Sequence, residues 1–251
     1  MTRTDNTSYY DAFSGDYDRG RDRGYHKLID DQAAALVRRV GVDKHALEVG
    51  CGTGLIMARV AEFAASVRGV DISPGMLEHA RRRGLDVCEG SATRLPFADA
   101  SFDVVYSFKV LAHVEAIDAA LAEMRRVARP GGHLVFDAYN RDSLRYLIKR
   151  AWGPRRTSAE FDEAAIVTRF DAPSQVLARA EGLGAIVDRA GIRVVTAHPA
   201  VLRVPIVGRV TEAIEWGVMR SPLWRFGGFV VLTVRVPTSE MGASMGHGHR
   251  A

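Results

Sequence analysis

The stretch "HALEVGCGTG", residues 45–54, decides the fold because it places three glycines within five positions directly after an apolar run. Residues 46–49 predict a short buried strand, and apolar residues at helical spacing resume at Leu55. A strand, a glycine-rich turn and a helix in this order bring the backbone close to a ligand at the end of the strand. The spacing of the glycines indicates which ligand.

Two common phosphate-binding turns do not fit this stretch. A triphosphate-binding loop has the pattern GxxxxGK[ST], and no lysine follows Gly54. A dinucleotide-binding turn has the pattern GxGxxG, whereas here the spacing is GxGxG and Leu55 stands at the place of the third glycine. The dinucleotide interpretation is therefore weakened, although the sequence does not eliminate it.

Two carboxylates discriminate further between ligands. Glu48 lies two residues before the first glycine, where we expect it to face the mouth of the turn. A carboxylate there repels a pyrophosphate and suits a ligand with a positive net charge. Asp71 ends the next predicted strand, where a carboxylate can accept both hydroxyls of a ribose. These residues indicate a ligand with a ribose and a cationic group but no phosphate.

Predicted strands and helices alternate along most of the chain. Strands are predicted at residues 46–49, 67–72, 86–89, 102–108, 134–139, 191–196 and 229–236. Helices are predicted at residues 25–41, 55–65, 74–82, 114–128, 143–151 and 174–180. This alternation predicts an α/β fold with an open, mostly parallel sheet that is covered on both faces.

The remaining segments suggest one domain with additions. We predict an N-terminal arm or lid at residues 1–24, a single domain at 25–238 and a disordered tail at 239–251. Residues 199–226 are too apolar for a solvated loop and contain Trp216 and Trp224. We expect residues 140–170 and 199–226 to form an apolar cap over a substrate, with core packing or a homodimer interface as the alternatives.

The composition is that of an ordinary globular protein, with 47% hydrophobic and 25% charged residues and a formal net charge of +4. Arginine clusters at residues 81–83, 125–126 and 155–156 lack interleaved aromatic residues, which argues against nucleic-acid binding. No apolar run approaches the roughly 20 residues of a membrane span. Cys51 and Cys88 form no disulfide framework or metal cluster, so we expect a cytoplasmic protein without a metal.

Four motifs in order, "EVGCGTG", "GVDIS", "EGSATRLPFADASFDVVYSF" and "RPGGHLVF", resemble the class I S-adenosylmethionine-dependent methyltransferases. The resemblance extends over about residues 9–140 and is greatest to the small-molecule branch typified by the ubiquinone and menaquinone biosynthesis enzymes. It implies a Rossmann-like α/β fold, with a seven-stranded sheet whose last strand is antiparallel. It also implies S-adenosylmethionine as the cofactor and S-adenosylhomocysteine as the product.

The resemblance also implies where the cofactor binds. Its methionine and ribose parts would be contacted by Glu48, Gly50, Cys51 and Gly52, and its ribose hydroxyls would be bound by Asp71. The adenine would lie beside Ile72 and Met76, and the adenine amino group would contact Ser91 and Ala92. The methionine end would contact Ser107 and Phe108, and Tyr17 would close over the cofactor. Ser91 departs from the family pattern, in which Asp-Ala is frequent. Core packing is the alternative for Met76 and Phe108, and a surface position is the alternative for Tyr17.

Methyl transfer from a sulfonium is an in-line displacement at an activated carbon, so the enzyme mainly aligns the acceptor and excludes water. A general base is needed only if the acceptor must lose a proton. His113 is the candidate base because we expect it to begin the helix after the fourth strand, with helix capping or packing as the alternative. Candidate substrate contacts are Tyr139, Asn140 and Trp216.

Residues 107–110 contrast with the Asn/Asp-Pro-Pro-Tyr/Phe tetrapeptide of nucleic-acid amino methyltransferases, since they read Ser-Phe-Lys-Val. Neither cysteine follows a proline, as the nucleophile of a base C5 methyltransferase does. A small-molecule acceptor is therefore favoured, with its O, N, C or S atom left open. A non-catalytic binding or regulatory protein with this fold, or a nicotinamide-dependent oxidoreductase, remains an alternative.

Overall fold

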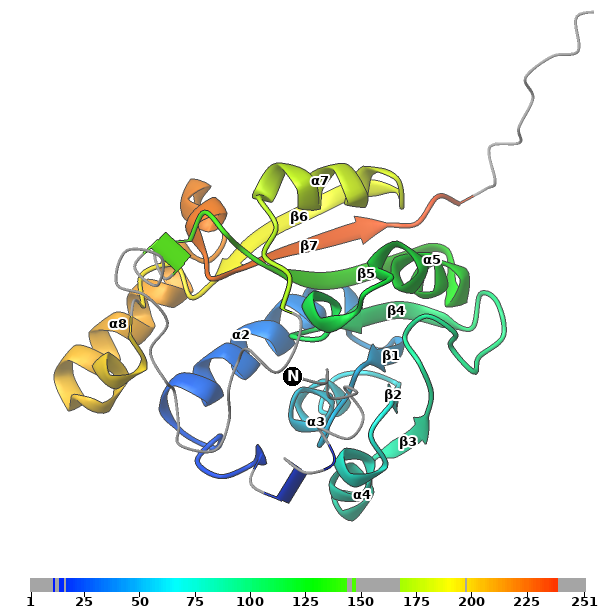
Figure 1. Cartoon of the computed structure of the whole chain (residues 1–251), viewed down its shortest axis with the longest axis horizontal. Coiled ribbons are helices and arrows are strands. Elements are labelled where there is room, and N and C mark those ends of the chain that lie inside the picture. Colours follow the sequence, from blue (N-terminus) through cyan, green and yellow to red (C-terminus); the bar gives the residue numbers. More distant parts are fainter. Residues whose placement is uncertain are drawn as a thin grey trace, which may run out of the picture.

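The computed structural model describes residues 11, 14–15, 17–143, 146–147, 168–196 and 198–238 of the 251-residue chain. These residues form a seven-stranded sheet with the order β3-β2-β1-β4-β5-β7-β6 (Figure 1). The strands are β1 (His45–Val49), β2 (Ser66–Asp71), β3 (Asp86–Glu89), β4 (Phe102–Ser107), β5 (Ala128–Tyr139), β6 (Ala185–Ile192) and β7 (Phe229–Arg235). The predicted tail and most of the predicted insertion at 140–170 lie outside the described residues.

The strand directions confirm the predicted fold class. β1 pairs in parallel with β2 and β4, β2 pairs in parallel with β3, and β4 with β5. β7, the last strand, is antiparallel to both of its neighbours, β5 and β6. The carboxyl ends of β1, β2, β4 and β5 therefore meet at one edge of the sheet, which is where open α/β sheets bind ligands.

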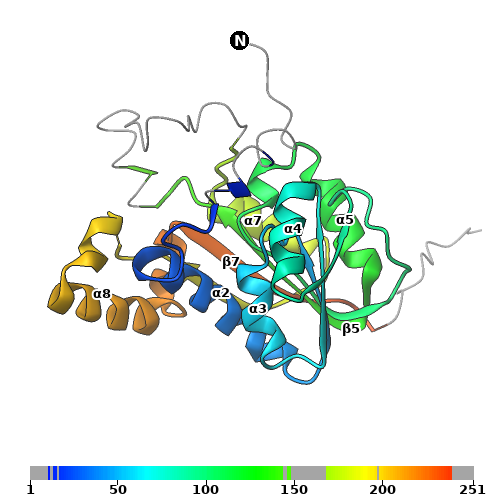
Figure 2. The ribbon, with the colours of Figure 1, turned by 90° about the horizontal axis from the view of Figure 1, so that it is seen from below.

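Helices cover both faces of the sheet (Figures 1 and 2). They are α2 (Gly24–Gly41), α3 (Leu55–Ala61), α4 (Pro74–Arg82), α5 (Ile117–Val127), α7 (Pro173–Glu181) and α8 (Pro205–Val218), with the short 3₁₀ helices η1 (Leu111–His113), η3 (Pro199–Arg203) and η4 (Pro222–Phe226). Leu36 of α2 and Ile56 of α3 share a hydrophobic cluster with Tyr106 of β4. Met124 of α5 clusters instead with Val105, which points to the other face because side chains alternate along a strand.

The structure corrects three predicted boundaries. The helix expected at 114–128 begins at Ile117, and residues 130–132, expected to end it, already belong to β5. Gly132 allows this because a Cβ there would lie 2.7 Å from the carbonyl oxygen of Asp103 in β4. The strand expected at 191–196 is β6, which begins at Ala185. β6 is an edge strand whose first residues are not fully buried, so its sequence lacks an apolar run.

The apolar segment 199–226 is helical, as predicted, and forms η3, α8 and η4. α8 lies at one end of the molecule, beyond α2 (Figures 1 and 2). Gly208 and Glu215 are its buried residues, whereas Ile206, Val210 and Ile214 on the opposite side are exposed, with Ile206 at 78%. The apolar residues that we expected to be packed therefore form an outward face, and their predicted role as a cap or a dimer interface stays a prediction.

Candidate functional site

The glycine turn lies at the carboxyl edge of the sheet, directly after β1. Gly50, Gly52 and Gly54 all have positive φ angles, of 76°, 52° and 82°. A Cβ on Gly50 would lie 2.3 Å from Val110, and one on Gly54 would lie 2.3 Å from Leu85. A Cβ on Gly52 would meet nothing within 4 Å. Two of the glycines therefore allow close packing within the protein, whereas Gly52 has open space beside it.

Asp71 ties the glycine turn to the end of β2. Its Oδ2 accepts a hydrogen bond of 2.8 Å from the Gly52 amide, and its Oδ1 accepts one of 2.9 Å from the Ser73 amide. Burial raises the pKa of Asp71, although these amide hydrogen bonds act in the opposite direction. The two carboxylate oxygens have four lone pairs and the Ser73, Gly52 and Ile72 amides engage three, so one remains for a hydroxyl group beside Gly52. The arrangement fits a ribose.

Glu48 lies deeper than the sequence suggested. We expected it at the mouth of the turn, but it is 2% exposed and accepts a hydrogen bond of 3.2 Å from the Tyr106 hydroxyl. Burial raises the pKa of Glu48 well above its usual value, while the nearby charge of Lys109 lowers it. A buried carboxylate is stabilised by a neighbouring cation. A cationic ligand group beside Glu48 would favour its ionised form, whereas a phosphate would oppose it.

The predicted adenine contacts differ in their surroundings. Ile72 is half-exposed at the end of β2, whereas Met76 is buried in α4. Ser91 and Ala92 are partly exposed in the loop after β3. The Ser91 hydroxyl lies 2.8 Å from the Thr93 hydroxyl and accepts a hydrogen bond of 3.2 Å from the Thr93 amide. The Ser91 side chain is thus engaged in a local turn, so its predicted contact with an adenine amino group would compete with that turn.

Three other predicted cofactor residues have buried side chains. Ser107 donates a hydrogen bond of 2.8 Å to the carbonyl oxygen of Val49 and so joins β4 to β1. Phe108 belongs to the hydrophobic cluster on the α2 face. Burial raises the pKa of the Cys51 thiol, which keeps it protonated and unsuited to act as a nucleophile. These side chains pack within the protein beside the turn, and the predicted contacts of these residues with the cofactor stay a prediction.

The candidate base and substrate residues fall into two groups. His113 does not begin a helix as expected; it ends η1, and its ring meets the Tyr139 ring edge-on at 5.6 Å. Asn140 is buried, and its amide donates hydrogen bonds to the carbonyl oxygens of Arg225 and Gly227. Trp216 lies on α8 and is 38% exposed. The structure therefore brings His113 and Tyr139 together, whereas Asn140 connects β5 to η4.

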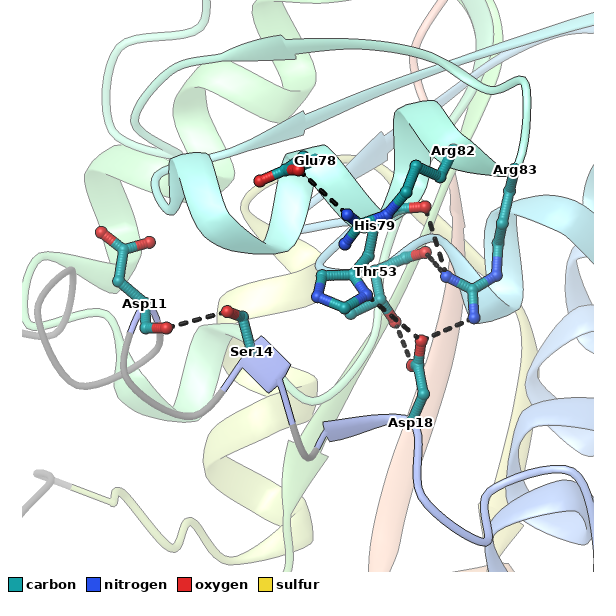
Figure 3. A network of polar contacts seen from close by, with 8 residues as sticks. All are labelled: Asp11, Ser14, Asp18, Thr53, Glu78, His79, Arg82 and Arg83. Atoms are coloured by element: carbon teal, nitrogen blue, oxygen red, sulfur yellow. Dashed lines mark hydrogen bonds and ion pairs between the residues drawn. The ribbon is translucent and has the colours of Figure 1, made fainter.

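The N-terminal segment contacts the glycine turn through a residue that the sequence analysis missed. Asp18 accepts a hydrogen bond of 2.7 Å from the Thr53 hydroxyl and forms an ion pair of 2.6 Å with Arg83 (Figure 3). Asp11 accepts hydrogen bonds from the Ser73 hydroxyl and, at 3.0 Å, from the Gly75 amide. The sequence motif "YYDAFSGDYD" indicated an arm but pointed to Tyr17, whose ring packs against the Arg21 guanidinium.

A second group that the sequence analysis missed lies beneath the site. The Lys109 ammonium pairs at 2.6 Å with Asp30 of α2, which is fully buried. The Lys109 amide donates a hydrogen bond of 2.9 Å to Asp137 of β5. Burial raises the pKa of Asp137 to about 7. Asp30 and Lys109 lie 79 positions apart, and no sequence pattern links them.

Among the residues that the structure describes, no three His, Cys, Asp or Glu side chains are grouped as metal ligands. In the same residues, no helix has the length and apolar character that crossing a membrane requires.

Comparisons with known proteins agree with this geometry. Residues 47–136 match the family model of the methyltransferase domain. Over these residues the chain is similar to a methyltransferase domain. The match begins in β1 and ends in β5, so it includes the glycine turn, Asp71 and the His113 segment. The family resemblance predicted from the sequence is confirmed.

Curated relatives and a solved structure share the domain. Malonyl-[acyl-carrier protein] O-methyltransferase of Erwinia pyrifoliae is 34% identical over 166 residues, which cover 65% of this chain and 60% of the relative. Demethylmenaquinone methyltransferase of Renibacterium salmoninarum is 35% identical over 150 residues, or 59% of this chain and 58% of the relative. The chain thus spans about six tenths of these relatives.

The N-methyltransferase NodS of Bradyrhizobium japonicum, solved in complex with S-adenosylhomocysteine, superposes with a TM-score of 0.62. The superposition covers 93% of this chain and 100% of NodS at 18% identity. At this identity the likeness shows that the methyltransferase domain shares the fold of NodS.

Proposed function

We propose that this chain is an S-adenosylmethionine-dependent methyltransferase that acts on a small-molecule acceptor. The observation that carries the proposal is the pairing of Asp71 with the Gly52 amide beside open space. The names of both curated relatives are those of methyltransferases, which supports the same reaction class. The two cysteines are unpaired, which supports a reducing, cytoplasmic location.

The residues of the site fit the methyl donor in charge and shape. S-Adenosylmethionine supplies a methyl group on a positively charged sulfur. Asp71 would hold the ribose hydroxyls, and the buried Glu48 would stabilise the positive charge of the methionine part. Gly52 leaves room for the ligand against the backbone. These contacts orient the donor, so the protein contributes alignment of the acceptor and exclusion of water.

The acceptor would enter beside His113 and Tyr139, whose rings meet at the carboxyl ends of β4 and β5. His113 Nδ1 lies 3.5 Å from the Thr168 hydroxyl, so the imidazole is held in a polar position. We assign His113 as the group that takes a proton from an acceptor whose nucleophile must be deprotonated. An acceptor with a free lone pair would need only positioning by these two rings.

Calorimetric titration with S-adenosylmethionine and S-adenosylhomocysteine tests the proposal. We expect both ligands to bind and Asp71→Asn to weaken both, because the neutral amide offers a ribose diol a poorer set of acceptors. Asp86→Asn is the matched control, since Asp86 lies at the start of β3, away from the turn. If the wild-type protein binds neither ligand, or binds only a nicotinamide dinucleotide, the proposal is wrong.

A further inference from the structure

A cavity of about 640 Å³ lies between the N-terminal segment, the start of α2 and η3. Its volume is in the range of small-molecule sites. Its polar wall contains Arg19 and Arg23 from the segment before α2, His26 from α2, and Arg203 from η3. Leu202 contributes to its apolar wall. Guanidinium groups from two elements far apart in sequence thus line one concave surface.

No carboxylate of the described residues lines this cavity. The acidic residues of the neighbouring elements are engaged elsewhere or point away. Asp18 binds Thr53 and Arg83, and Asp30 pairs with Lys109. Asp22 is exposed and is not part of the lining. Among the described residues the lining therefore has arginine side chains and no carboxylate, and such a concave surface focuses the field on an anion.

The amino end of α2 adds to this charge. Arg23 is the N-cap residue of α2 and makes no side-chain capping hydrogen bond, and the first turn of the helix contains no acidic residue. The first-turn amides of a helix carry partial positive charge. His26 contributes no charge at neutral pH, because burial and then the charge of Arg21 lower its pKa to about 4. A neutral imidazole can still donate a hydrogen bond to an anion.

The wall beside the arginines is held in place. The Arg193 guanidinium donates a hydrogen bond of 2.7 Å to the Tyr25 hydroxyl and lies over the Tyr25 ring at 4.7 Å. Tyr25 is another lining residue of the cavity. Arg193 is itself buried and donates a hydrogen bond of 2.9 Å to the carbonyl oxygen of Thr196. The cavity is thus partly shaped before any ligand binds.

We propose that this cavity binds a carboxylate or phosphate group of the methyl acceptor. The inference rests on the proposed function, because it specifies that the methyl acceptor of that function is an anion. The N-terminal segment connects the two sites: Asp18 binds Thr53 of the glycine turn, and Arg19 and Arg23 follow within the same segment. Lys109, which follows β4, lies near enough to His26 for its charge to lower the pKa of that imidazole. An acceptor with an anionic end in the cavity can therefore extend toward the carboxyl edge of the sheet.

Binding of two probe anions tests the cavity itself. Pyrophosphate and malonate are titrated into the wild-type protein and into Arg23→Gln/Arg203→Gln, both without and with saturating S-adenosylhomocysteine. We expect the double variant to bind the preferred anion at least tenfold more weakly and S-adenosylhomocysteine as tightly as before. Arg235→Gln, which removes one arginine charge at the end of β7, should leave both affinities unchanged. The probe that binds more tightly distinguishes a phosphate from a carboxylate site.

Equal anion affinity in the double variant and the wild-type protein would overturn the inference. A failure of the proposed function is distinguishable, since it would appear as absent S-adenosylhomocysteine binding whatever the anion result.

A second experiment links the anion to methyl transfer. A small-molecule extract is separated on an anion exchanger into retained and unretained fractions before any enzyme is added. Each fraction is then incubated with protein and S-adenosylmethionine labelled in its methyl group. We expect labelled product from the retained fraction, and much less of it with Arg23→Gln/Arg203→Gln. Label transfer to the unretained fraction alone would show that the acceptor is not anionic.

Discussion

The hydroxyl of Thr53 donates a hydrogen bond of 2.7 Å to the carboxylate of Asp18. Through this bond the N-terminal segment is attached to the glycine turn, and Arg83 completes the link by donating to both partners, the Asp18 carboxylate and the Thr53 carbonyl oxygen (Figure 3). The segment that we predict to cover the candidate cofactor site is therefore tied to the glycine turn. Binding of the cofactor and ordering of the segment should be coupled.

Asp18→Ala should weaken S-adenosylhomocysteine binding by about tenfold. Asp18→Ala removes the hydrogen bonds from Thr53 and Arg83, and each charge-assisted hydrogen bond is worth about 1.5–3 kcal/mol, of which only the part coupled to ligand binding appears in the affinity. Calorimetry measures the change. Asp22→Ala is the control, because Asp22 is exposed in the same segment. An unchanged affinity in Asp18→Ala would mean that the segment does not contribute to the cofactor site.

Gly52→Ala and Gly54→Ala should have different effects, although both residues have positive φ. A left-handed conformation costs an alanine about 1–2 kcal/mol at either position. At Gly54 the new Cβ also overlaps Leu85, whereas at Gly52 it enters open space. We expect Gly54→Ala to lose more stability, and Gly52→Ala to remain folded but bind the cofactor poorly. Urea unfolding and calorimetry, run on both variants, separate the two effects.

Glu215→Gln should destabilise the protein by about 2–3 kcal/mol, since hydrogen bonds to a charged group are worth about 1.5–3 kcal/mol. The buried Glu215 carboxylate accepts hydrogen bonds from the amides of Val194, Val195 and Thr196 and from the Thr196 hydroxyl. The amide of a glutamine cannot accept them all. Urea unfolding measures the loss, and Glu212→Gln on the exposed side of α8 should change it little.

As the pH rises, the free energy of unfolding should fall less for Asp137→Asn than for the wild-type protein. Burial raises the folded-state pKa of Asp137 from 3.8 to about 7, so the folded protein holds this proton more tightly than the unfolded chain. The contribution of this pKa difference to stability is complete below the pKa of Asp137 in the unfolded chain and is lost as the pH rises through about 7. Unfolding free energies at pH 5 and pH 8 should therefore differ more for the wild-type protein than for Asp137→Asn.

The wild-type protein and Asp137→Asn would show the same pH dependence if another group were responsible. Asp99→Asn, a change at an exposed carboxylate, is the control and should follow the wild-type protein.

Local patterns account for what the sequence predicted well. The glycine spacing and the strand ends located Gly52 and Asp71, because both lie at the ends of short apolar runs. The mostly parallel direction of the strands follows from the alternation of strands and helices, whereas their order in the sheet was not predicted. The sequence could not reveal the Asp18–Thr53 bond or the Asp30–Lys109 pair, since neither has a spacing that a helix or strand would produce.

The C-terminal half was harder to predict because the residues that are buried there are not the ones that its composition suggests. α8 has many aliphatic residues, yet it contacts the rest of the protein mainly through Gly208, Glu215 and the adjacent Met219, while its aliphatic face is exposed. β6 lacks the apolar run of the central strands because it lies at the edge of the sheet. In both cases the side chains that face the protein are a minority of the element.

The position of β7 between β5 and β6 has a consequence for synthesis of the chain. β6 is made before β7, but among the described strands it pairs with β7 alone. On the ribosome, β1 to β5 can pair with one another as they emerge, whereas β6 must wait until residue 235 has left the exit tunnel. A nascent chain stalled before that point would contain β1 to β5, which carry the candidate cofactor site, and would expose an unpaired edge on β5. A chaperone would need to shield that edge.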